Sequence, residues 1–236
     1  MQLILKRYCK EAENSDIMKI FLDTANKELI EKWAPTGLID GVTTNPTHLS
    51  KENKNPTEQV IAICNLLPSG IISVEVVETE PEKIYTQACS IAALAQNIAV
   101  KIPCHASYYP IIKRLVDEGI TLNITLVFSL AQGLMMAKLG VHYISPFIGR
   151  LDDNKGNGIE LVQQLRTMLD YYQFNTQLLA ASIRDVTHLE KVILAGADVA
   201  TIPGAVFENS LTHPLTDKGM AQFLHDWKTL HITQFP

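Results

Sequence analysis

The sequence lacks the features of a disulfide-stabilised or metal-binding protein. It has only four cysteines in 236 residues, and their spacing is not that of metal ligands. We therefore expect reduced thiols, as in a cytoplasmic protein. The seven histidines are scattered without ligand spacing, so we interpret them as surface or core residues and expect no metal site. The glycine fingerprints of dinucleotide-binding and P-loop proteins are absent as well, and we expect no cofactor.

The chain also has no excess of positive charge. Its formal net charge is −5, its charges are interspersed, and no basic stripe or basic amphipathic helix is present, which argues against nucleic acid and membrane surfaces as partners. The apolar stretch at residues 3–5 is too short for a signal-peptide core. The uncharged run at 119–137 could span a bilayer by length, but its polar residues and β-branched first half predict a strand followed by a buried helix.

What the chain does have is a regular alternation of strand-like and helix-like segments. The expected strands are residues 19–23, 41–45, 70–76, 98–102, 120–126, 143–147, 177–181 and 198–202. The expected helices are residues 26–32, 56–67, 81–96, 106–118, 130–139, 158–172, 186–194 and 219–229. This alternation predicts an α/β fold with a parallel sheet, and eight units predict closure into a single (β/α)8 TIM barrel, since an open sheet would leave edges.

Lys101 lies in a short apolar run that ends at Pro103 and reads as a strand buried on both faces. Burying an ammonium group is costly, and losing its proton would leave a neutral amine. A neutral amine in a dry pocket is a nucleophile that can form a Schiff base with a carbonyl substrate. The alternative is a lysine at a strand end whose head reaches solvent.

Polar residues gather near the ends of the expected strands, where a barrel carries its active site. Each has a simpler explanation: Asp23 could cap a helix, Asn45-Pro46 could be a turn, and Thr125 and Ser182 could be satisfied hydroxyls. Glu75 is harder to explain, because carboxylates are rarely buried without a partner. The full set is Asp23, Thr43, Thr44, Asn45, Glu75, Lys101, Asn123, Thr125, Ser145, Phe147 and Ser182.

Two arginines follow the sixth and seventh expected strands. Arg150 and Arg184 present guanidinium groups whose geometry matches phosphate, and barrels often bind phosphate at their late loops. Each alone could be part of a structural ion pair. Together with Ser182 they predict a phosphate clamp.

Seven segments resemble the transaldolases, in particular the short bacterial and archaeal subfamily that includes fructose-6-phosphate aldolases. They are IFLDTA (20–25), DGVTTNP (40–46), VEVV (74–77), VKIP (100–103), NITLVFS (123–129), SPFIGR (145–150) and AASIR (180–184). The resemblance runs from Met18 to about Trp227. It implies a barrel domain over residues 18–236, preceded by an N-terminal extension, residues 1–17, of unknown structure.

The resemblance also implies roles for the strand-end residues. Lys101 would be the Schiff-base lysine, Asp23 the acid and base at the substrate hydroxyl, and Glu75 and Thr125 the residues that hold and activate a water. The remaining residues would bind a sugar phosphate: Thr43, Asn45, Asn123, Ser145 and Phe147 around the dihydroxyacetone portion, and Arg150, Ser182 and Arg184 at the phosphate.

Two positions favour a transaldolase over an aldolase. By the resemblance, the aldolases carry glutamine where this chain has Glu75 and tyrosine where it has Phe147. The expected reaction converts sedoheptulose 7-phosphate and glyceraldehyde 3-phosphate to erythrose 4-phosphate and fructose 6-phosphate. A fructose-6-phosphate aldolase and a non-catalytic sugar-phosphate-binding barrel are the alternatives, and a pyridoxal-phosphate lysine is a weaker one. The resemblance further implies a homo-oligomer, a pentamer or a decamer.

Overall fold

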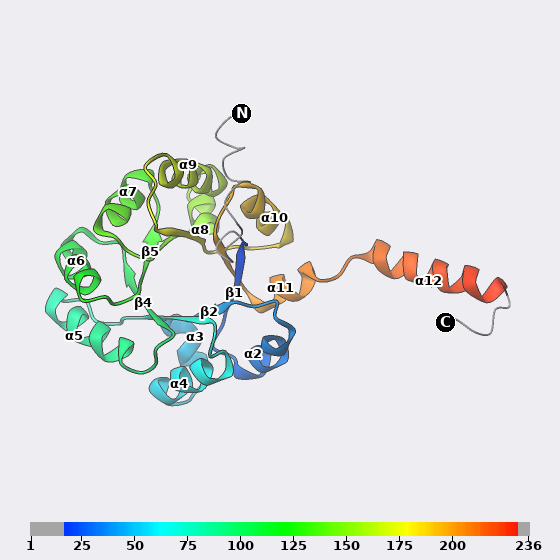
Figure 1. Ribbon diagram of the computed structural model, residues 1–236, viewed down its shortest axis with the longest axis horizontal. Coiled ribbons are helices and arrows are strands. Elements are labelled where there is room, and N and C mark those ends of the chain that lie inside the picture. The colour runs from blue at the N-terminus through cyan, green and yellow to red at the C-terminus, as the bar shows by residue number, and fades with distance from the viewer. Residues whose placement is uncertain (1–16, 231–236) are drawn as a thin grey trace.

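The computed structural model describes residues 17–230, which contain a closed barrel of eight parallel strands. Each strand pairs with the next along the chain, and β8 pairs with β1, for example through Val199 and Lys19. The predicted (β/α)8 barrel is confirmed, and Figure 1 shows the helices ringing the strands. The strands are β1 (Lys19–Asp23), β2 (Gly41–Thr43), β3 (Ile71–Glu75), β4 (Ile98–Pro103), β5 (Leu122–Val127), β6 (Tyr143–Pro146), β7 (Gln177–Ala180) and β8 (Val199–Ile202).

The helices follow the expected positions with three additions, α3, α8 and α11, and α12 begins five residues earlier than expected. The additions hold six or seven residues each, too few for a helical period to show in the sequence. Short 3-10 turns at Ala34–Thr36 and Ala106–Tyr108 adjoin α2 and α6. The helices are α2 (Lys27–Trp33), α3 (Pro46–Lys51), α4 (Pro56–Leu66), α5 (Pro81–Ala92), α6 (Tyr109–Asp117), α7 (Leu130–Leu139), α8 (Ile148–Asp153), α9 (Gly158–Tyr171), α10 (Val186–Leu194), α11 (Gly204–Ser210) and α12 (Pro214–Thr229).

Side chains alternate between two apolar layers along each strand. On β1, Phe21 belongs to a cluster with Ala99 and Tyr143, whereas the next residue, Leu22, belongs to the larger cluster that also contains helix residues such as Ile30. Alternation is the geometry of an extended strand, in which successive side chains point to opposite faces. Burying a side chain such as Leu22 fully contributes about 1.5–3 kcal/mol.

The register of the strands brings polar residues to one level of the barrel. Glu75 on β3 pairs with Lys101 on β4, and Lys101 pairs with Asn123 on β5. Asp23 on β1 pairs with Thr43 on β2. These residues share the inward-facing parity of their strands and lie near the strands' C-terminal ends, so the mouth of the barrel at that end is polar.

The run at 119–137 is folded as predicted, as β5 followed by most of α7. Within residues 17–230, none of the helices is long and apolar enough to cross a membrane. α12 extends away from the barrel and buries none of its residues (Figure 1). The predicted extension at residues 1–17 lies, apart from Ile17, outside the described residues.

Candidate active site

A cavity of about 170 Å³ lies at the C-terminal mouth of the barrel. The predicted site residues line it, apart from Thr44, Glu75 and Arg184. Its complete lining is Asp23, Thr43, Asn45, Lys101, Asn123, Thr125, Ser145, Phe147, Arg150, Leu179, Ala181, Ser182 and Thr201. The predicted residues from β1 to β7 therefore come together in one place.

Lys101 is buried, with 5% of its surface exposed, and it has a carboxylate partner. Its Nζ lies 3.0 Å from Oε2 of Glu75, whose side chain is 15% exposed. The same Nζ donates a hydrogen bond to the carbonyl oxygen of Thr44 at 3.1 Å. Glu75 thus has the partner that a buried carboxylate requires, and its carboxylate lies within hydrogen-bond distance of the Lys101 amine.

Asn123 is held rigidly beside Lys101. Its Nδ2 donates to Oγ of Ser73 at 3.0 Å, and its Oδ1 accepts a hydrogen bond from Oγ of Ser145 at 2.6 Å. Thr125 lies on the same strand, β5, two residues after Asn123. Its hydroxyl is buried and has no hydrogen-bond partner among the described residues. Buried polar atoms normally have a partner, so Thr125 marks a position where a water or a substrate group would bind.

Asp23 accepts a hydrogen bond at Oδ1 from the hydroxyl of Thr43, at 2.9 Å. The Thr43 hydroxyl also lies 2.5 Å from the hydroxyl of Thr201 on β8. Burial by itself raises the pKa of Asp23, but the ring of His48, the charge of Lys101 and the Thr43 hydroxyl together hold that pKa below its ordinary value. The carboxylate form of Asp23 is therefore favoured, as a proton acceptor requires.

His48 is a site residue that the sequence analysis missed. Its Nε2 lies 3.4 Å from Asp23 Oδ1, so the assignment to surface or core was incomplete. The sequence feature that could have revealed the position of His48 is the Asn45-Pro46 pair. The Asn45 side chain caps α3 by accepting a hydrogen bond from the backbone N–H of His48 at 2.9 Å, and Pro46 is the first residue of the helix. Recognised as the start of a helix rather than a turn, this pair would have placed His48 at the mouth of the barrel. Thr201, at the end of the last strand, was also missed.

The opposite side of the cavity is built by β6, α8 and the segment after β7. The guanidinium of Arg150 lies over the Phe147 ring, 5.1 Å from its centroid. Ser182 adopts the left-handed conformation, with φ of +62°, and its carbonyl oxygen accepts a hydrogen bond from the Gly149 N–H at 3.1 Å. A Cβ on Gly149 would lie 2.4 Å from that oxygen, so this close approach requires glycine.

Arg184 does not line the cavity. Its side chain is 52% exposed and forms an ion pair with Asp153 at the end of α8. Phosphate binding by Arg184 remains a prediction. To bind a phosphate in the cavity, the Arg184 side chain would have to leave Asp153.

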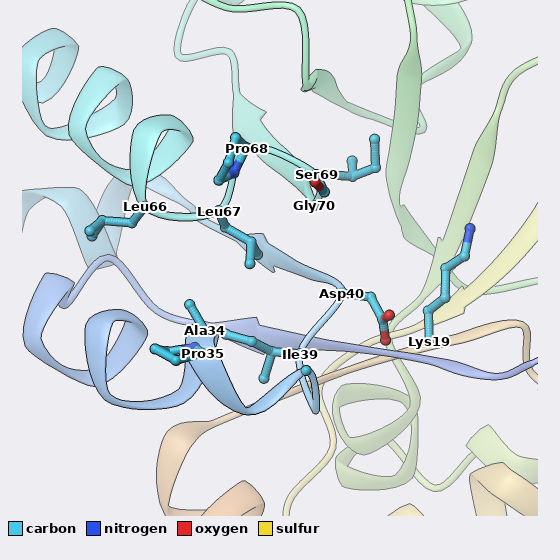
Figure 2. A pocket seen from close by; sticks show the side chains of 12 residues that line it. Lys19, Ala34, Pro35, Ile39, Asp40, Leu66, Leu67, Pro68, Ser69 and Gly70 are labelled. Carbon is cyan, nitrogen blue, oxygen red and sulfur yellow. The ribbon is translucent and has the colours of Figure 1, made fainter.

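A larger depression, of about 550 Å³, lies at the opposite end of the barrel (Figure 2). Its charged side chains are Lys19 and Asp40, and Asp40 is engaged by the backbone N–H of Ile20 at 2.8 Å. Most of the other side chains in view are apolar, including Leu66, Leu67 and Ile39. It gathers no set of convergent polar groups, whereas the smaller cavity does, and barrels carry their chemistry at the C-terminal mouth.

Known proteins resemble the chain along most of its length. The family described as Transaldolase/Fructose-6-phosphate aldolase matches residues 20–234. A probable transaldolase of Lactiplantibacillus plantarum is 52% identical over 92% of this chain and 100% of its own length. A probable transaldolase of Caulobacter sp. strain K31 is 46% identical over 89% of this chain and 96% of its own.

Among solved structures, a thiamine phosphate pyrophosphorylase from Pyrococcus furiosus superposes with a TM-score of 0.56 at 14% identity, covering 82% of this chain and 89% of its own. That likeness concerns the fold alone. The family match includes Asp23, Glu75 and Lys101. The chain belongs to the transaldolase/fructose-6-phosphate aldolase family.

Proposed function

We propose that the protein is a transaldolase that transfers a dihydroxyacetone unit from sedoheptulose 7-phosphate to glyceraldehyde 3-phosphate, giving erythrose 4-phosphate and fructose 6-phosphate. The observation that carries this proposal is the buried Lys101–Glu75 pair at the same barrel mouth as the ionised Asp23. Membership of the family supports an enzyme, and relatives that share about half of the sequence are named probable transaldolases.

The first step is attack of the Lys101 amine on the ketose carbonyl. Glu75, 3.0 Å away, accepts the ammonium proton, and loss of the carbonyl oxygen as water leaves a protonated imine on Lys101. A water held between Glu75 and the unpartnered hydroxyl of Thr125 would carry protons to and from the departing oxygen. Asn123 and Ser145, fixed by their mutual hydrogen bond, would orient the dihydroxyacetone hydroxyls.

The second step is cleavage of the bond between carbons 3 and 4 of the donor. The Asp23 carboxylate removes the proton of the carbon-4 hydroxyl, an aldehyde leaves, and the bonding electron pair moves into the imine to give an enamine. The acceptor aldehyde then takes the place of the leaving one, the enamine carbon attacks it, and Asp23 returns its proton to the new hydroxyl. Hydrolysis of the imine releases the product and restores Lys101.

Phe147 supports transfer rather than release of dihydroxyacetone. It lines the cavity beside Arg150 and has no hydroxyl that could protonate the enamine. A transferase must protect that carbanion-like intermediate from protonation until the acceptor arrives. Arg150 and Ser182, on the same side of the cavity, would hold the substrate phosphate, with Arg184 joining them after it leaves Asp153.

We also assign the protein to the pentose phosphate pathway and to the cytoplasm. The reaction above interconverts phosphorylated sugars of that pathway. Cys64, Cys89 and Cys104 are free thiols in the structure, which accords with a reducing compartment.

We further propose a homo-oligomer, a pentamer or a decamer by the family resemblance, in which α12 packs on a second copy of the chain. α12 buries none of its residues against its own barrel. Met220, Phe223 and Leu224 are 58%, 74% and 58% exposed and, with Trp227, follow the 3-4-7 spacing of one apolar helix face. Light scattering should give a mass several times 26.2 kDa, and the double variant Phe223→Ser/Leu224→Ser should dissociate the assembly. A monomeric wild-type protein would refute this proposal.

The experiment that tests the function is a coupled assay with fructose 6-phosphate as donor, with and without an aldose phosphate acceptor. A transaldolase forms the new ketose only when erythrose 4-phosphate is present and releases little free dihydroxyacetone without it. A fructose-6-phosphate aldolase would release dihydroxyacetone in both cases, and a non-catalytic binding barrel would give neither product. Lys101→Ala is the matched control and should be inactive in both arms.

A further inference from the structure

His48 approaches the acid–base carboxylate from outside the cavity. Its Nε2 lies 3.4 Å from Oδ1 of Asp23, the oxygen that also accepts the hydrogen bond from Thr43. Both side chains of the His48–Asp23 pair are 26% exposed, so the contact is partly shielded from solvent. Asp23 therefore has a ring nitrogen on one side and a hydroxyl on another.

The position of His48 is fixed by the start of α3. Asn45 accepts a hydrogen bond from the backbone N–H of His48 at 2.9 Å, and Pro46 occupies the first helical position. Asn45 itself lines the cavity, so the segment that shapes the substrate site also sets the position of the ring. His48 is not part of the lining.

The charges around this pair come from two neighbouring strands. Lys101 on β4 acts on Asp23 through its charge, but Lys101 is itself paired with Glu75 on β3 at 3.0 Å. Within residues 17–230, the ion pairs give His48 no carboxylate other than Asp23. Of the two basic side chains that act on Asp23, His48 is thus the one whose interaction is not shared with a second carboxylate.

We propose that His48 is a positioning residue of the reaction, which keeps the Asp23 carboxylate ionised and oriented toward the donor hydroxyl. This inference rests on the proposed function, in which Asp23 exchanges a proton with that hydroxyl. Because His48 acts through Asp23 and does not line the cavity, its loss should lower kcat and leave KM nearly unchanged.

The test compares His48→Leu, which removes the ring nitrogens, with His48→Gln, which keeps an N–H donor but cannot carry charge. A partly shielded contact to a charged group predicts a kcat about tenfold lower in His48→Leu, with KM for fructose 6-phosphate within about twofold. Asp23 would lose a neighbour that lowers its pKa, so the acid limb of the kcat/KM profile should move to higher pH. His48→Gln should recover part of kcat but keep the displaced acid limb.

His142→Leu is the matched control, because His142 is exposed and precedes β6 at the far end of the barrel. It should have wild-type kinetics, and thermal unfolding of all variants reports whether the fold is intact. Wild-type kcat and an unshifted acid limb in His48→Leu would overturn the inference. A fall in kcat without any shift of the acid limb in either His48 variant would overturn it too, as a purely structural effect. Absence of a borohydride-trapped substrate adduct in the wild-type protein would instead refute the proposed function.

Discussion

Replacing Thr43 by valine tests the hydrogen-bonded support of Asp23. The substitution keeps the shape of the side chain but removes the hydroxyl that lies 2.9 Å from Asp23 and 2.5 Å from Thr201. A hydrogen bond to a charged group contributes about 1.5–3 kcal/mol. Thr201 is 3% exposed, and leaving its buried hydroxyl without a partner costs about 1–3 kcal/mol. Since Thr201 can still rotate toward other groups, we expect a total loss of about 2–4 kcal/mol.

The pH dependence of this loss has a definite sign. The pKa of Asp23 is lowered in the folded protein, so its contribution to stability is present above the ordinary pKa of aspartate and fades as the pH falls through the lowered value. Thr43→Val raises the pKa of Asp23 again. The difference in unfolding free energy between variant and wild type should therefore be larger at pH 7 than at pH 3, and the acid limb of kcat/KM should move to higher pH.

Urea unfolding at matched protein concentration measures the loss, and the double variant Thr43→Val/Thr201→Val separates its parts. With both hydroxyls gone, the penalty for an unpaired Thr201 disappears, so the double variant should be at least as stable as the single one. Thr176→Val is the control: it removes a buried hydroxyl that donates to the Val141 carbonyl at 2.7 Å, and it should lower stability without moving the pH profile. An unfolding free energy of Thr43→Val within about 0.5 kcal/mol of wild type would refute the reasoning.

Three further predictions concern the substrate and the chain ends. Arg150→Ala should raise KM for phosphorylated donors about 10–150-fold with little change in kcat. Arg184→Ala should raise KM less, because Arg184 must first leave its carboxylate partner Asp153. Equal effects of these substitutions on unphosphorylated donors would contradict the phosphate clamp. Phe147→Tyr should increase dihydroxyacetone release from fructose 6-phosphate and slow transfer. Adding Glu75→Gln should raise the ratio of release to transfer further, while slowing imine formation because Lys101 loses its proton acceptor. An unaltered ratio in the single variant would show that Phe147 does not decide it. A chain that starts at Met18 should keep near-wild-type activity in the coupled assay, and a large loss would mean that the preceding residues support the fold or the assembly.

The barrel and most of its site could be predicted because strand geometry is local. Most of the expected strands contain an apolar run of the right length, and the two-residue period puts Glu75, Lys101 and Asn123 on the inward face of consecutive strands. Chain order makes these strands neighbours, and their observed register places the three residues at one level. The buried lysine and the buried carboxylate were each recognisable alone, and the register shows that they are partners.

What could not be predicted depends on short helices and on contacts across the barrel. α3 and α8 are too short to show a helical period, so the position of His48 and the Arg184–Asp153 pair were not foreseen. The Thr43–Thr201 contact joins β2 to β8, the two strands that flank β1, and no spacing in the sequence reveals it. α12 was expected to begin at residue 219, because its start is marked by the His213 cap and by Pro214 in the first turn rather than by apolar periodicity.

The most direct test of the account is borohydride trapping of the wild-type protein with fructose 6-phosphate, followed by peptide mapping. The Schiff-base mechanism predicts one reduced adduct, located on Lys101, because this is the lysine that lines the cavity beside a carboxylate that can accept its proton. Lys101→Ala should give no adduct and no transfer while still folding, with a lower unfolding free energy because buried Glu75 loses its partner. An adduct on a different lysine, or full transfer activity without any adduct, would contradict the central claim.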